Sequence, residues 1–126
     1  MNKESPEAID FIFKMAIDVY FEKESKDNSV LKIHNQFGTN KSSCEMYIRI
    51  IGDMVKGKRY PRGMSALATD NILKNFYSYK TKEFFNNSIN SLKQYITHYE
   101  NQNATIMHKI RKILAKWENI SSNNGY

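Results

Sequence analysis

A stripe of apolar residues spaced four and three apart constrains the fold of this chain more than any other feature. The stripe consists of Phe85, Ile89, Leu92, Ile96 and Tyr99. It extends over about four turns of an α-helix and places every member on one face. Since no β-hairpin pattern occurs in the sequence, this face must be covered by other helices. The stripe therefore predicts an all-α fold.

Helix start and stop signals divide the rest of the chain. Ser5 before Pro6 is a helix start, and we expect this helix to end near Glu24, followed by a turn at residues 25–29. Residues 30–37 fit either a short helix or an irregular segment. A further helix is expected from about Ser42 to Val55, with Gly57 as the stop, and another from the N-cap Ser65 to about Tyr77, in which Leu67 supplies apolar contacts. A fourth long helix is expected from Thr81 to a break at residues 101–103. The last expected helix carries the apolar stripe Ile106, Ile110, Ile113, Leu114 and Trp117.

These segments predict an irregular bundle of five or six helices in a single domain. At 126 residues the chain is long enough for a core without disulfides or metals. We expect the helical domain to cover residues 1–120 and residues 121–126 to form a disordered tail. The apolar stretches are interrupted by charges, so we expect neither a membrane span nor a signal peptide, and a cytoplasmic location.

Positive charge is concentrated in the later part of the chain. Residues 1–28 contain four lysines against seven acidic residues, whereas residues 41–62 contain six Lys/Arg against two acids. Residues 80–118 contain seven Lys/Arg against three acids. Such an asymmetry favours a polyanionic partner, although lysine-rich surfaces are common.

The densest cationic segment is the turn that follows the helix expected to end before Gly57. It carries two glycines, which permit a close backbone approach to a ligand, and arginines, which suit phosphate oxygens and guanine edges. We predict that the turn binds nucleic acid through Lys56, Lys58, Arg59, Tyr60 and Arg62, with Tyr60 either stacking on a base or positioning the turn. The alternative is an ordinary solvated turn whose tyrosine and proline pack on the bundle.

The last expected helix carries a second group of cations opposite its apolar stripe. Its members are Lys109, Arg111, Lys112 and Lys116. They form either a solvated helix face or a set of phosphate contacts beside the turn. DNA binding would gain support if both basic segments lay on one face.

Catalytic and metal-binding patterns are missing from the sequence. The histidines His34, His98 and His108 lack metal-ligand spacing, and there is no nucleophile elbow, P-loop or dinucleotide fingerprint. The single cysteine, Cys44, cannot form an internal disulfide and is expected in the core. We therefore expect no metal, no cofactor and a non-catalytic role.

Residues 40–100 resemble a known type of domain. The order of Asn40-Lys41-Ser42-Ser43, Tyr47-Ile48, residues 54–62, Ala68-Thr69, Ile72-Leu73 and residues 91–100 is similar to the helical domain ahead of HNH nuclease domains in bacterial restriction-type endonucleases. The chain is more distantly similar to the SAM-like DNA-clasping domain of tyrosine recombinases. Both resemblances imply DNA binding. No HNH segment follows Glu100 within the remaining 26 residues, so the first resemblance implies a recognition part without the nuclease.

The expected function is a non-catalytic DNA-binding accessory or recognition module of a restriction, defence or mobile-element system. A different hypothesis is a protein-interaction module or small inhibitor that docks on a partner protein through an exposed aromatic surface. The partner could also be a second copy of the chain, giving a homodimer. Several aromatic residues, among them Phe84 beside Phe85 and Tyr77 near Tyr79, cannot all face one core. This observation keeps the second hypothesis open.

Overall fold

The computed structural model describes residues 5–79 and 81–125, and within them every regular element is an α-helix. The helices are α1 (Pro6–Tyr20), α2 (Lys26–Phe37), α3 (Lys41–Lys56), α4 (Ala66–Ser78), α5 (Lys82–Asn103) and α6 (His108–Asn123). The predicted all-α class with five or six helices is confirmed. Their internal contacts form two compact units, Met1–Gly52 and Asp53–Tyr126.

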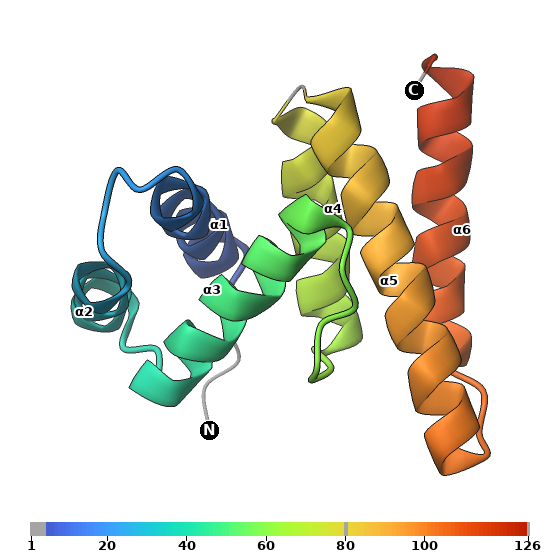
Figure 1. Cartoon of the computed structure of the whole chain (residues 1–126), viewed down its shortest axis with the longest axis horizontal. Coiled ribbons are helices and arrows are strands. Elements are labelled where there is room, and N and C mark those ends of the chain that lie inside the picture. The colour runs from blue at the N-terminus through green and yellow to red at the C-terminus, as the bar shows by residue number, and fades with distance from the viewer. Residues whose placement is uncertain (1–4, 80, 126) are drawn as a thin grey trace. The chain divides into compact units, whose positions relative to one another are not determined.

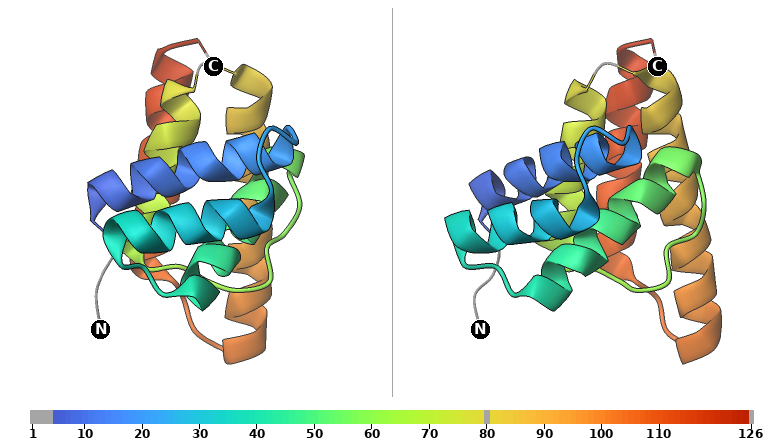
Figure 2. Two further views of the ribbon diagram at one scale, coloured as in Figure 1. Left: turned by 90° about the vertical axis from the view of Figure 1, so that its left-hand side faces the viewer. Right: turned by 60° about the vertical axis from the view of Figure 1, so that its left-hand side comes forward.

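In the first unit, α1 and α2 lie side by side and run in opposite directions (Figures 1 and 2). Ile9 and Ile12 of α1 and Ile33 of α2 are completely buried. The rings of Phe11 and Phe37 join the two helices, with centroids 5.6 Å apart. Apolar contact between the two helices therefore stabilises this unit.

The predicted start of α1 is confirmed, because the Ser5 hydroxyl accepts the Ala8 N–H at 3.1 Å. The predicted end near Glu24 is wrong, since α1 stops at Tyr20 and Glu22 has a φ of +60°. The turn expected at residues 25–29 is also wrong. The Ser25 hydroxyl accepts the Asn28 N–H at 3.1 Å, so these residues are the capped first turn of α2.

α3 begins and ends as its sequence predicts. The Asn40 carboxamide oxygen accepts the Ser42 N–H at 2.8 Å at its start. Gly57 follows its last residue with a φ of +72°, a conformation that glycine adopts without strain. Cys44 lies on its buried side and is completely inaccessible, as expected.

In the second unit, α4, α5 and α6 lie side by side (Figures 1 and 2). Leu73 and Phe76 of α4 and Phe85 and Leu92 of α5 are completely buried among them. Four members of the predicted stripe, Phe85, Ile89, Leu92 and Ile96, are confirmed as the core face of α5, whereas Tyr99 is only half-buried. Trp117 of α6 completes the core and donates its indole N–H to Asp70 at 2.7 Å.

Three details of this unit differ from the prediction. Residues 101–103 continue α5, which ends only at Ala104 in the left-handed conformation. Residues 121–123 belong to α6 with Ser121 buried, so this part of the expected tail is helical; Tyr126 lies outside the described residues. Leu67 and Ile106, expected in the core, are each 55% exposed.

Candidate nucleic-acid interface

The cationic turn is fastened to one flank of α5 by side chains of that helix. The Asn87 carboxamide donates to the Val55 carbonyl at 2.8 Å, and the Gln94 carboxamide donates to the Gly57 carbonyl at 2.9 Å. Between them, the Ser91 hydroxyl donates to the Lys58 carbonyl. Residues spaced four and three apart share a helical face, so α5 presents these three donors as one row. The row fixes the backbone that carries the cations.

Tyr60 anchors the same turn from inside. Its ring stacks on Tyr95 of α5, with centroids 4.7 Å apart and planes 14° apart, and only 1% of its surface is exposed. Burial raises the pKa of the Tyr60 hydroxyl, and Tyr95 adds to the effect. Because both rings are packed, Tyr60 is not free to stack on a base. Of its two predicted roles, the positioning role fits this burial.

Gly63 allows the backbone of the turn to pass close to the Tyr95 ring. A Cβ atom at this position would overlap the hydroxyl of Tyr95. A side chain at Gly63 would therefore displace Tyr95, and with it the surface on which Tyr60 rests. The sequence predicted that this glycine permits a close approach to a ligand, whereas in the structure it permits the close approach of the Tyr95 ring.

The charged side chains of the turn point to solvent. Lys56, Lys58, Arg59 and Arg62 are all exposed. Within the described residues none of the four forms an ion pair. Their charges are therefore available to an external anion.

The basic residues of α6 are arranged differently. The Lys116 ammonium lies 2.5 Å from the Asp70 carboxylate on α4, and Arg111 pairs with Glu100 on α5. Although partial burial raises the pKa of Asp70, the hydrogen bonds from Lys116 and Trp117 outweigh it and hold that pKa below its ordinary value. Two of the four predicted cations are thus engaged within the chain.

Lys109 and Lys112 are exposed and lie on the same side of α6 as Lys116, whose ammonium group pairs with Asp70 of α4. Meanwhile α6 contacts α5 through the side that carries Lys93 and Glu100, whereas the turn is held by the row on another side of that helix. The row that holds the turn and the contact with α6 therefore lie on different sides of α5.

Glu100 holds the connection between α5 and α6. Its carboxylate accepts the Met107 N–H at 2.8 Å, at a helix start that has no capping side chain of its own, and it accepts from two nitrogens of Arg111 at 2.7 and 2.5 Å. The hydrogen bonds from Arg111, followed by the Met107 N–H, lower the pKa of Glu100 from 4.5 to about 2.

This pKa predicts an acid-dependent loss of stability. A carboxyl group whose pKa is lowered by folding stabilises the fold above its unfolded value and loses that contribution as the pH falls from 4.5 toward about 2. Glu100→Gln should therefore be less stable than the wild type at pH 7, and the difference should shrink over this pH range. Urea unfolding at pH 7 and pH 3 measures it. Glu118→Gln, which breaks only the exposed pair with Lys93, is the control and should cost less at pH 7. A difference that does not vary with pH would contradict the assignment.

The exposed aromatic residues do not gather in one element. Phe21 follows α1 and is 44% exposed, and Tyr79 follows α4 and is 40% exposed. Tyr79 is stacked on Phe84 with centroids 6.1 Å apart. Within the described residues no cluster of three or more His, Cys, Asp or Glu side chains is placed to bind a metal. None of the helices described is both long and apolar enough to cross a membrane.

Comparison with family models, curated proteins and solved structures finds no match to this chain.

Proposed function

We propose that this chain binds DNA through the cationic turn, as a non-catalytic recognition or accessory module. The observation that carries the proposal is the combination of four exposed, unpaired cations with a backbone that α5 holds in place. Lysine and arginine at the surface of a protein bind DNA by neutralising phosphates and releasing counterions.

Rigidity distinguishes this turn from a solvated loop. Ordering a flexible segment on binding costs conformational entropy, and a turn already fixed by hydrogen bonds and a buried ring avoids most of that cost. The carbonyls of Val55, Gly57 and Lys58 are all occupied by α5 side chains. Fewer carbonyl dipoles are then available to oppose an approaching phosphate.

We also propose that the chain works in a restriction, defence or mobile-element system. This part of the proposal is supported only by the resemblance of residues 40–100 to domains of such systems. Such a module would deliver a separate catalytic subunit or domain to its DNA. Since Arg111 and Lys116 are paired within the chain, we assign the phosphate contacts to the four unpaired cations of the turn.

Fluorescence anisotropy with a labelled DNA duplex tests this proposal. Lys58→Ala combined with Arg59→Ala should weaken binding at least tenfold, because two phosphate contacts are removed without disturbing the row on α5. Lys109→Ala with Lys112→Ala removes the same charge from α6 and is the matched control, expected to change affinity much less. Equal losses in both variants, or no binding by the wild type, would refute the turn as the interface.

A further inference from the structure

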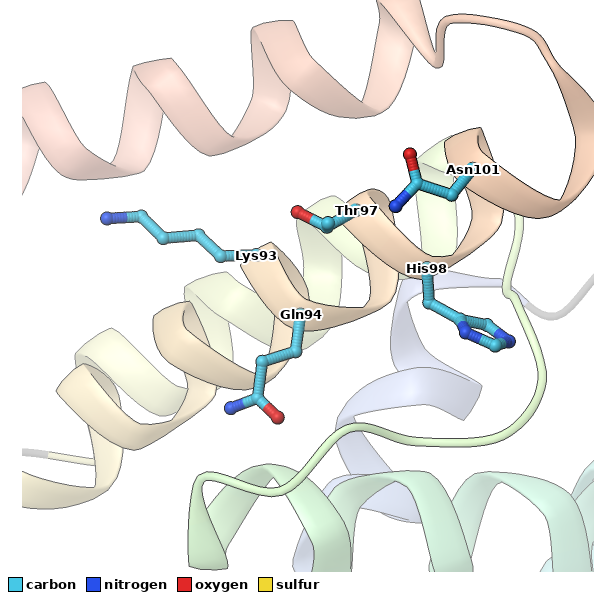
Figure 3. A pocket seen from close by; sticks show the side chains of 5 residues that line it. All are labelled: Lys93, Gln94, Thr97, His98 and Asn101. Carbon is cyan, nitrogen blue, oxygen red and sulfur yellow. The ribbon is translucent and has the colours of Figure 1, made fainter.

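A strip of uncharged polar side chains runs along the exposed face of α5. Gln94, Thr97, His98 and Asn101, together with Lys93, line a shallow hollow on this face (Figure 3). Figure 3 shows Lys93, Thr97 and Asn101 projecting from one side of the helix and Gln94 and His98 from the other. Asn86 and Asn90 extend the same face by two turns toward the start of the helix, and both are exposed.

Apart from Gln94, which donates to the Gly57 carbonyl, and Lys93, which pairs with Glu118, the polar groups of this strip are unused by the fold. Within the part of the chain that the structure describes, Asn86, Asn90, Thr97 and Asn101 make no side-chain hydrogen bond. Their neighbours Asn87 and Ser91 instead hold the turn. One face of α5 thus supports the cations, while the adjacent face presents free donors and acceptors.

The composition of the strip differs from that of an ordinary solvated helix face. Asparagine and threonine are weaker helix formers than lysine, glutamate or alanine, so these residues do not serve helix stability. Between residues 86 and 101 the exposed face carries no acidic side chain until Glu100, which is engaged by Arg111. A polyanion can therefore approach it without repulsion.

We propose that this strip reads base edges in the major groove of DNA while the turn holds the phosphate backbone. The inference rests on the proposed function. A carboxamide can make a pair of hydrogen bonds to adenine, and the threonine methyl group can contact thymine, so the substrate class is duplex DNA with A·T pairs in its recognised segment. The major groove admits an α-helix, and phosphate contacts beside that helix set its register.

Selection from a duplex library with a randomised central segment tests the inference. The wild type should enrich a sequence containing A·T pairs. Asn90→Ala with Asn101→Ala should bind the unselected library with unchanged salt dependence, but its discrimination should fall by about 5- to 150-fold for each base that it no longer reads. Both replacements raise helix propensity, so α5 should remain folded, which circular dichroism verifies.

The outcomes separate the two proposals. If the wild type binds the library but enriches nothing, or if the asparagine variant enriches the same sequence equally well, the base-reading strip is refuted and DNA binding by the turn stands. Lys58→Ala with Arg59→Ala should have the opposite effect, with weaker binding and the same preferred sequence. If the wild type binds no DNA, both proposals fall.

Discussion

Tyr60→Ala is expected to lower the free energy of unfolding by about 3–5 kcal/mol, the range for deleting a buried aromatic ring. The Tyr60 ring is 1% exposed and stacks on Tyr95, so its removal leaves a cavity in addition to the lost burial. Such a loss is a large fraction of the stability of a small domain. The same change should weaken DNA binding, because the turn loses its anchor.

Tyr60→Phe is the control for this prediction. It keeps the ring and the stack on Tyr95, so both stability and DNA affinity should stay close to those of the wild type. Urea unfolding followed by circular dichroism gives the free energies. A cost below about 1 kcal/mol for Tyr60→Ala would show that the ring is not packed as described.

Phe85→Ala should have an effect of similar size, about 3–5 kcal/mol, for a reason unconnected with DNA. Phe85 is completely buried between α5 and its neighbours and meets the ring of Tyr77 edge to face at 5.5 Å. Asn86→Ala changes the next residue on the exposed face and should alter stability by no more than about 0.5 kcal/mol. Equal effects of the two changes, measured by urea unfolding, would contradict the placement of α5.

The sequence predicted the helices whose signals are local. The spacing of Phe85, Ile89 and Leu92 predicted the buried face of α5, and Ser65 and Gly57 marked helix ends where the structure has them. The start of α2 was missed although its signal was present, since Ser25 is followed by Asp27 in the first turn. The end of α5 could not be read, because Ala104 adopts a left-handed conformation that its residue type does not indicate.

The candidate interface was predictable only in its charges. Glycines and cations within a short segment indicated the turn, but its backbone is held by Asn87, Ser91 and Gln94, which lie 32 to 37 residues after the carbonyls that they bind. No local pattern links those residues to the turn. The burial of Tyr60 has the same origin, since its partner Tyr95 is brought close by the packing of α5. The pairing of Lys116 with Asp70 likewise depends on tertiary contact between α4 and α6.

The salt dependence of DNA binding tests the central claim most directly. The logarithm of the association constant should fall linearly with the logarithm of the salt concentration. Lys58→Ala with Arg59→Ala should reduce that slope by about 2, close to 1 for each phosphate that the variant no longer neutralises. Lys109→Ala with Lys112→Ala should leave the slope unchanged. A slope that is the same in the turn variant and the wild type, or one that falls equally in both variants, would contradict the claim that this turn is the DNA-binding element.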